Sequence, residues 1–498
     1  MAETTPAVDH DEDAAHLASL GYDYDTTFKR EMSFFGNVSL GFTYLSPIAG
    51  VYSMFAISLG TAGPPMAWAL VIALVGQFLV GLIFGEVVSN YPVAGGVYPW
   101  SRRLWGRKYA WMNGWIYVVA LVGTIAAVAY GAAPFVGSLF GASLDSVGIV
   151  LIALGTLVIA TILNFSGTKV LSVAAMVGLI AELIGAVVIG VYLIFFGRQH
   201  EWSIFFDNQG IGNDAPGGYL GAFAAAALIG MFAYYGFEAN GDVAEEIKDP
   251  SRQVPKAMRM TLYIGGFAAN LLAFSLVLAV PDFQAVADGT VTDPIGELLM
   301  ANFGPIFPIV MLIIVIAFIS CITSLQAAAS RLIYSMARDG FLPGSEKLAK
   351  FNAKRHVPNN ALLVAAIVPG LIVILSLFLV QALFALVGFG TVGIYVGFGM
   401  VVLAALRARI KGWKPAGKFT LGAWAYPVNI LALIWRAVAV INIIWPRPTG
   451  GTWVEDYLLI MTTVGVIAIG WIYMLVSKAY LRGNAPAADA SGPIKTMV

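Results

Sequence analysis

Three acidic residues lie inside apolar stretches of this 498-residue sequence, where an ionised side chain is costly. Glu238 and Asp242 are four residues apart, so on one helix they would share a face. Two neighbouring carboxylates attract a cation, and an organic ammonium group is the first candidate. Glu182 lies in the middle of another apolar stretch, on a stripe of small residues that would turn it toward other helices.

Hydroxyl groups in a further apolar stretch could act together with Glu182. They belong to Ser320, Thr323 and Ser324, which occupy positions i, i+3 and i+4. Oxygen ligands suit a hard cation such as Na⁺, so this group is a candidate Na⁺ site. Glu182 could instead carry a proton.

Each acidic residue also has a structural interpretation. Asp242 could be the N-cap of a helix, because a short acidic side chain satisfies free N–H groups there. Glu238 could pair with a neighbouring helix, and Glu182, in the fifth apolar stretch, could tie this stretch to the eighth, which carries Ser320, Thr323 and Ser324. Arg436, in a late apolar stretch, is expected to reach the membrane interface or to pair outside the core.

The composition predicts that lipid surrounds most of the chain. Hydrophobic residues make up 59% and charged residues 11%, with a mean hydropathy of +0.82, whereas soluble proteins carry about 25% charged residues. Apolar runs of about 20 residues recur without the alternation of a membrane β-barrel. We therefore expect an all-α integral membrane protein with twelve transmembrane helices. The spans are expected near 33–60, 66–89, 109–136, 146–164, 170–196, 219–245, 259–280, 305–335, 360–379, 382–406, 422–445 and 456–478.

The positive charges predict the orientation. All of the 28 Lys and Arg residues except Arg198, Arg436 and Arg447 fall in the termini or in the loops after even-numbered spans. The positive-inside rule then places both termini in the cytoplasm. No signal peptide is expected in residues 1–32, which are polar and acidic. A plasma membrane, such as a bacterial inner membrane, is the expected location.

The first and sixth spans each contain an interruption. The stretch 46–53 reads SPIAGVYS, and Pro47 removes a backbone donor within it. The stretch 234–242 reads YYGFEANGD. Breaks at matching positions of two five-span halves are typical of inverted-repeat transporters, whose half-helix ends bind charged groups. The expected divisions are a cytoplasmic tail at 1–32, repeats at 33–196 and 219–406, two appended spans at 422–478 and a cytoplasmic tail at 479–498.

Four separated motifs resemble those of the amino acid–polyamine–organocation transporters. They are YPVAGGVY at 91–98, GFEA at 236–239 with AEEIKDPSRQVP at 244–255, SRLIYSMARDGFLP at 330–343, and FTLG at 419–422 with PVN at 427–429. The last motif is similar to the amino acid/choline branch. The resemblance implies a LeuT-type fold with a 5+5 inverted repeat, alternating access, and a substrate held between the broken helices.

The resemblance also implies roles for single residues. The start of the helix after the first break would present its backbone to a substrate carboxylate, and Phe237 would be an aromatic lid. Three departures stand out. The acid of the sixth span is commonly Asp but here is Glu238, and an additional acid, Asp242, lies one helical turn later. The fifth-span lysine of proton-coupled relatives is here Glu182. The expected substrate-binding residues are Ile48, Ala49, Gly50, Val51, Tyr234, Phe237, Glu238, Asp242 and Tyr395, and the expected ion-coupling residues are Glu182, Ser320, Thr323 and Ser324.

Together these features predict a secondary transporter, and not an enzyme, that imports an amino acid, a GABA-like compound or a simple amine. A proton is the favoured coupling ion, and no other cofactor is expected. Na⁺ symport and exchange are alternatives, and a transporter-like nutrient sensor is a more remote one. The expected partners are the solute and the lipid bilayer. A nucleic acid is not expected, because the net charge is zero, and monomer and homodimer both stay open.

Overall fold

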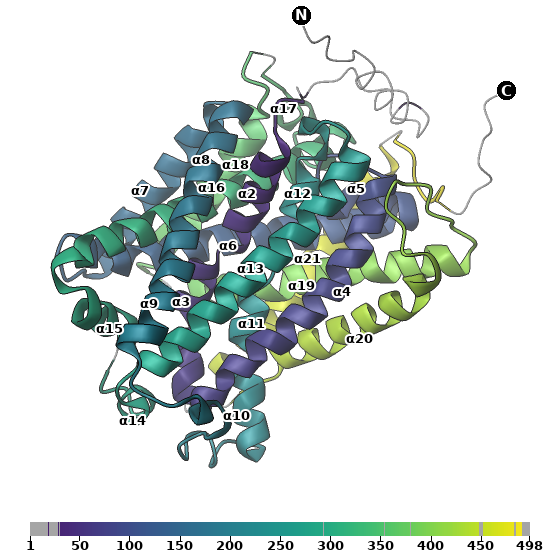
Figure 1. Cartoon of the computed structure of the whole chain (residues 1–498). Helices are drawn as coiled ribbons and strands as arrows, with labels where there is room; N and C mark the ends of the chain where they lie inside the picture. Colours follow the sequence, from purple (N-terminus) through teal and green to yellow (C-terminus); the bar gives the residue numbers. More distant parts are fainter. Residues whose placement is uncertain are drawn as a thin grey trace, which may run out of the picture.

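The computed structural model describes Ala18, Phe28 and residues 30–291, 293–352, 354–378, 380–447, 452–482 and 485–490, with the backbone alone for 380–387. Much of the predicted tails at 1–32 and 479–498 lies outside these residues. The described residues form helices joined by loops, without a β-strand among them (Figure 1). Its first half contains α2 (Phe34–Leu45), α3 (Pro47–Ala62), α4 (Ala67–Asn90), α5 (Val97–Leu104), α6 (Arg107–Leu139), α7 (Ser146–Phe165), α8 (Thr168–Leu183), α9 (Ile189–Tyr192), α10 (Gly218–Ala226), α11 (Leu228–Ala233) and α12 (Ala239–Asp242). Its second half contains α13 (Pro250–Ala279), α14 (Phe283–Ala287), α15 (Pro294–Phe303), α16 (Phe307–Arg338), α17 (Ser345–Leu348), α18 (Asn359–Leu375), α19 (Val380–Ile410), α20 (Ala425–Ile444) and α21 (Trp453–Ser477).

The helices confirm an all-α membrane fold. Ten helices among the described residues are long and apolar enough to cross a membrane. Two shorter apolar helices, Gly218–Ala233 and Asn359–Leu375, occupy the positions predicted for the sixth and ninth spans. The count of twelve stays a prediction, because the sixth span is interrupted and the ninth is a helix of 17 residues.

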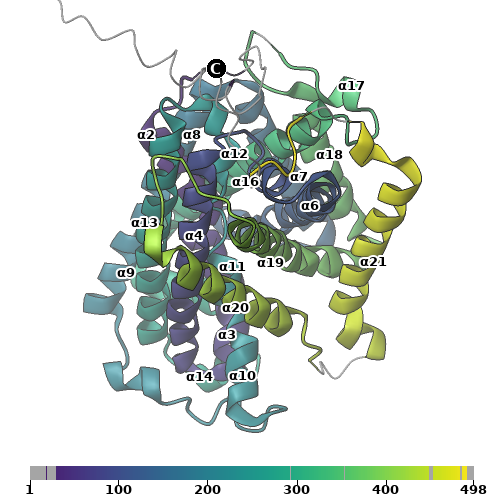
Figure 2. The same ribbon diagram turned by 90° about the vertical axis from the view of Figure 1, so that its right-hand side faces the viewer.

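The first span lies at the centre of the bundle and the last at its edge. In the most apolar stretch of α2–α3, 78% of the residues are buried, against 11% in α21. Helix α2 packs against α8, α13 and α16, whereas α21 packs against α6 and α19 (Figure 2). Outward-facing side chains such as Leu151, Val158 and Ile162 of α7 are apolar and exposed, as a lipid-facing surface requires.

The fifth span changes its helical geometry directly after α8. It continues as π-helix over Ile184–Val188, returns to α-helix in α9, and ends as π-helix over Leu193–Gly197. Such π-helical turns are rare in proteins overall, and those that occur are often at functional sites. Glu182 is the last residue but one of α8, so it lies directly before this change.

Ion pairs hold the sixth and eighth spans together at one end of the bundle, where α5, α12 and α17 lie (top of Figure 1). We call this the basic end. Arg331 of α16 lies 2.9 Å from Glu246, and both side chains are buried. Arg338 lies 3.1 Å from Glu245. The two glutamates follow α12 in the chain, so these pairs connect the part of the sixth span after its break to α16.

The loop between α4 and α5 inserts against the same half-helix. Ala94 donates its N–H to the Glu245 side chain at 3.0 Å, and Gly95 donates its N–H to the carbonyl of Asp242 at 3.1 Å. Gly95 and Gly96 have φ values of 94° and 48°, which favour glycine. The YPVAGGVY motif is therefore a structural plug that closes the basic end against α12.

Residues 485–490 cross α5 at this end. Ala488 donates its N–H to the carbonyl of Arg102 at 2.8 Å, and Asp489 pairs with Arg103 at 3.0 Å. Arg102 also forms an ion pair with Asp339, at the end of α16. The segment 485–490, α5 and α16 are thus linked through two neighbouring arginines.

The ion pairs of the basic end should differ in their contribution to stability. Replacing Arg331 (Arg331→Met) leaves Glu246 buried, with the Thr168 hydroxyl as its one remaining side-chain partner in the described part of the chain. We expect this to cost about 3–5 kcal/mol. The exposed pair of Lys418 and Asp249 is the control, because Lys418→Met should cost less than about 1 kcal/mol. Thermal unfolding in detergent should show a clearly lower midpoint for Arg331→Met alone. Equal midpoints for both variants would contradict this assignment.

Candidate functional site

The first span breaks at Ser46, between α2 and α3. Ser46 has φ 45° and ψ 85°, so the chain turns left-handed for one residue. Pro47 follows as the first residue of α3, where its missing N–H costs nothing. Gly50 allows α3 to approach α11, because a Cβ at Gly50 would lie 2.9 Å from the Cα of Ala233.

The second break spans residues 234–238, between α11 and α12. Gly236 has a φ of 112°, and a Cβ there would lie 2.8 Å from the Cα of Leu45. The second break therefore rests on the last residue of α2. Each break contacts the other span through a glycine, which confirms the two interruptions and places them side by side.

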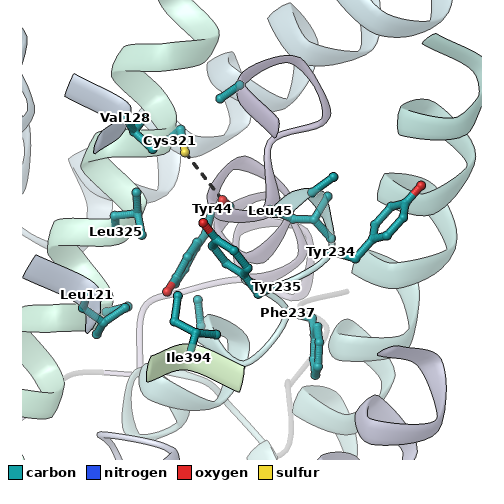
Figure 3. Close-up of a cluster of buried hydrophobic side chains, with 14 of the residues drawn as sticks. Tyr44, Leu45, Leu121, Val128, Tyr234, Tyr235, Phe237, Cys321, Leu325 and Ile394 are labelled. Carbon is teal, nitrogen blue, oxygen red and sulfur yellow. Dashed lines mark hydrogen bonds between the residues drawn. The ribbon is translucent and has the colours of Figure 1, made fainter. Parts of the chain in front are cut away.

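A small cavity lies between the two breaks. It encloses about 10 Å³, room for about one water molecule, so the site is closed. Figure 3 shows Tyr44 and Tyr235 side by side, with their rings nearly perpendicular at 77°, and Cys321 and Leu325 of α16 beside them. The lining comes from α2, α3, α6, α11, α16 and the second break, through Tyr44, Leu45, Ala49, Gly50, Thr124, Val128, Phe232, Tyr235, Cys321 and Leu325.

Glu238 is buried at the second break and has two hydrogen-bond partners. The backbone N–H of Gly236 donates to one carboxylate oxygen at 2.8 Å. The hydroxyl of Tyr117, on α6, donates to the other at 2.5 Å. Glu238 thus pairs with a neighbouring helix, as its structural interpretation expected, while its remaining lone pairs stay available to a donor such as an ammonium group.

Asp242 ends α12 and is fully buried. Its two carboxylate oxygens accept no hydrogen bond from any described residue. The carboxylate lies against Gly96, in the plug between α4 and α5. The N-cap interpretation is wrong, because Asp242 is the last residue of α12, its side chain accepts no backbone N–H among the described residues, and Val243 is the N-cap residue of the turn after it. It is a buried carboxylic group without a hydrogen-bond partner in the described part of the chain.

The side chain of Glu182, from α8, reaches the start of α3. Its carboxylate accepts the backbone N–H of Ile48 at 3.0 Å and the hydroxyl of Ser46. The Ser46 hydroxyl in turn accepts the N–H of Ala49 at 3.1 Å, and the Ser46 carbonyl accepts the N–H of Gly50 at 2.9 Å. Val51 is within α3, where the helical pattern supplies its acceptor.

The four predicted carboxylate-binding residues therefore lie at the first break, and the chain itself satisfies the N–H groups of Ile48, Ala49 and Gly50. Glu182 does connect the fifth span to the first. The structural role expected for it is present, although its partner is the first break and not the eighth span.

The three predicted hydroxyl groups of α16 have different surroundings. Ser320 is buried without a hydrogen-bond partner among the described residues and faces Gly178 of α8. Ser324 lies 2.7 Å from the hydroxyl of Thr43 on α2. Thr323 donates to the carbonyl of Ile319 in its own helix. The structure thus brings Ser320 and Ser324 to the α2–α8 side and leaves Thr323 bonded within α16.

The predicted aromatic residues surround the site at different depths. Tyr234 accepts a hydrogen bond from Asn270 of α13 and turns away from Tyr44 and Tyr235 (Figure 3). Phe237 packs against Phe84 and Phe398, with ring centroids 5.8 and 5.5 Å away. Ala49 and Gly50, which were predicted, line the cavity, whereas its other lining residues, Tyr44 and Tyr235 above all, were not predicted. Their positions next to Ser46 and Gly236 are the signal that could have identified them.

Arg436 of α20 is buried in the bundle, which corrects the expectation that it would reach the interface. It donates to Gln77 of α4, and its guanidinium lies 4.3 Å from the centre of the Tyr395 ring. Gln77 donates to the Tyr395 hydroxyl at 2.7 Å. The Nε and Nη1 groups of Arg436 have no hydrogen-bond partner among the described residues. Tyr395 is therefore part of this arginine cluster, outside the small cavity.

Comparison with known proteins identifies similar chains. The family model described as amino acid permease matches residues 35–472. Amino-acid permease BAT1 of Arabidopsis thaliana is 26% identical, over 94% of this chain and 95% of its own length. Its homolog in Oryza sativa subsp. japonica is 24% identical, over 94% and 93%. The aromatic amino acid transport protein AroP of Escherichia coli is 27% identical, over 85% of this chain and 91% of its own length.

The contact between the two breaks should depend on Gly236. In Gly236→Ala the methyl group would meet the Leu45 backbone at an unfavourable φ, so we expect a loss of about 1–3 kcal/mol or more. Gly465→Ala in α21 is the control, because its Cβ meets nothing within 4 Å and alanine favours a helix. Thermal unfolding in detergent measures both variants. A midpoint for Gly236→Ala equal to that of the control would show that the contact is loose.

Proposed function

The chain belongs to the amino acid permease family, and we propose that it imports an amino acid across the plasma membrane by alternating access, coupled to a proton. The family match covers the bundle from the first span to the last. The similar proteins are named as permeases and transport proteins, so this is an amino acid transporter and not an enzyme. The substrate class, the coupling ion and the direction are our proposals.

The observation that supports the substrate site is the closed cavity between the two broken spans. Interrupted backbone at membrane depth is tolerated where it is buried in protein or lines a cavity. This cavity is lined by residues on either side of the first break, by Tyr235 of the second break, and by α6, α11 and α16, and it has room for about one water molecule. A substrate must therefore move Tyr44 and Tyr235 apart, which makes the structure a closed state of the proposed cycle.

The cavity lining favours a neutral amino acid with an apolar or aromatic side chain. The lining residues are all uncharged, and Tyr44, Phe232 and Tyr235 contribute aromatic rings. An acidic or basic substrate side chain would therefore lack a counter-charge there. The similar AroP is named for aromatic amino acids, which agrees with this lining. We place the substrate ammonium at Glu238 and its carboxylate at the start of α3.

Proton coupling is proposed through Glu182. This carboxylate is fully buried and contacts the break directly, so a change in its protonation would alter the hydrogen bonds of Ser46 and Ile48. Na⁺ coupling is the second candidate. The Ser320 hydroxyl, which has no hydrogen-bond partner among the described residues, and the Thr43–Ser324 pair supply oxygen atoms for a cation beside α8.

The remaining features follow the charge pattern. We propose that the basic end faces the cytoplasm, because the loops after even-numbered spans carry most of the lysines and arginines. A plasma membrane, such as a bacterial inner membrane, agrees with this orientation. Both a monomer and a homodimer fit the exposed apolar surfaces of the outer helices.

Uptake into proteoliposomes tests the proposed function. The purified full chain should accumulate a labelled neutral amino acid when an inward proton gradient is imposed. Accumulation that requires an inward Na⁺ gradient would replace the proton with the second candidate. Uptake that requires an amino acid inside the vesicles would indicate exchange. Binding without any transport would overturn the transporter assignment in favour of a sensor.

The Glu238 carboxylate should be needed for substrate affinity. In Glu238→Gln the side chain can still accept from Tyr117, but it no longer carries the charge that an ammonium group requires. Loss of a charge-assisted hydrogen bond of about 1.5–3 kcal/mol corresponds to roughly a ten- to hundredfold weaker Kd. Glu201→Gln, at a side chain that is 80% exposed, is the control and should bind normally. Calorimetric titration of both variants would exclude the role of Glu238 if their Kd values agreed.

A further inference from the structure

The start of α3 has no free donor for a substrate carboxylate in this closed state. Three of the first four residues carry an N–H, and all three N–H groups are bonded within the chain. The Glu182 carboxylate accepts hydrogen bonds from the N–H of Ile48 and from the hydroxyl of Ser46. The carboxylate of Glu182 thus occupies the place that the proposed function gives to the carboxylate of the substrate.

The setting of Glu182 is that of a bound anion at a helix N-terminus. The side chain is fully buried, and no lysine, arginine or histidine of the described residues forms an ion pair with it. The partial positive charge at the start of α3 is its counter-charge. Among the described residues, Tyr52 of α3 and Cys321 of α16 are titratable side chains close enough to Glu182 to interact with it electrostatically.

A second carboxylate cannot join Glu182 at this place. Two carboxylates that share one set of donors repel each other, so one of them must leave or bind a proton. The arriving substrate carries its own carboxylate to the same N–H and hydroxyl groups. The substrate and an ionised Glu182 therefore exclude each other at the start of α3.

The structure offers Glu182 a second position. Ser320 of α16 and Tyr52 of α3 each have a buried hydroxyl without a hydrogen-bond partner among the described residues. Ser320 faces Gly178, one helical turn before Glu182 on the same side of α8. The π-helical turns begin two residues after Glu182, where the helix can change register. A protonated Glu182 can therefore turn from the start of α3 toward the hydroxyl of Ser320 or Tyr52.

We propose that Glu182 is a built-in occupant of the substrate-carboxylate site, which an incoming amino acid displaces while one proton from solution binds Glu182. This inference rests on the proposed function and specifies its coupling step. The substrate carboxylate accepts the hydrogen bonds of Ile48 and Ser46, and the proton stays on the displaced Glu182. The site holds one negative charge before the exchange and one after it. A ligand with an ammonium group but no carboxylate leaves Glu182 in place.

Proton counting during binding tests the exchange on the unmodified protein. The probes are the twenty standard amino acids, screened by thermal shift, and the decarboxylated amine of the one that stabilises the chain most. Calorimetry in buffers of different ionisation enthalpy then counts protons. We expect the amino acid to take up about one proton per molecule and the amine to take up none. Because binding takes up a proton, raising the pH should weaken binding. The Kd of the amino acid should increase about tenfold for each pH unit, over the pH range in which Glu182 is ionised in the free protein.

Glu182→Gln supplies the matched variant. Its neutral side chain has no charge to displace, so the amino acid should bind without proton uptake and with a Kd that no longer depends on pH. Glu201→Gln, in an exposed loop, should keep the proton uptake of the unmodified chain. The comparison of amino acid and amine on the unmodified protein needs no variant, so it stands even if Glu182→Gln fails to fold.

The outcomes separate this inference from the proposed function. If no amino acid stabilises the chain, the proposed function itself is overturned. If an amino acid binds without proton uptake, or if Glu182→Gln keeps that uptake, the displacement of Glu182 is overturned while the amino acid site remains. Equal proton uptake with the amino acid and with the amine would also overturn it, because the amine has no carboxylate to exchange.

Discussion

A backbone N–H group at membrane depth must find a hydrogen-bond acceptor within the protein, because lipid offers none. Both interrupted spans meet this requirement in the same way. The N–H of Ile48 at the first break is accepted by Glu182, and the N–H of Gly236 at the second break is accepted by Glu238. Each acceptor is a buried carboxylate. The chain therefore supplies its own carboxyl groups as acceptors at both breaks.

This arrangement removes the opposition between structural and functional interpretations of the acidic residues. A carboxylate that satisfies the broken backbone is also the group that a charged ligand must meet on entering the site. The contact of Gly50 with Ala233, and of Gly236 with Leu45, couples the two breaks directly. A change in the hydrogen bonds at one break therefore acts on the packing of the other.

The sequence predicted the features that depend on local composition. The apolar runs indicated a helical membrane protein, and Pro47, Gly50 and Gly236 marked the two breaks. The partners of the acidic residues could not be predicted, because they come from distant parts of the chain. Glu182 and Ile48 are 134 residues apart, and Tyr117 and Glu238 are 121 apart. The local pattern of one segment does not predict which distant segment it will contact.

Two interpretations that the structure contradicts have the same origin. Asp242 was considered as a helix cap, since the sequence does not show that α12 is a single turn that ends at this residue. Arg436 was expected at the interface, because its partners Gln77 and Tyr395 lie in other spans. The cavity residues Tyr44 and Tyr235 were not predicted for a different reason. Aromatic residues are common in membrane spans, and only their neighbours in the structure distinguish these two.

The absence of a cationic partner for Glu182 among the described residues has an electrical consequence. If the substrate carboxylate replaces this charge and Glu182 becomes neutral, a zwitterionic amino acid crosses together with one proton. Each completed cycle then moves one positive charge through the membrane. A membrane potential of 100 mV contributes about 2.3 kcal/mol to the movement of such a charge. Transport by this chain would therefore produce a current, and the voltage across the membrane would drive accumulation even without a difference in pH.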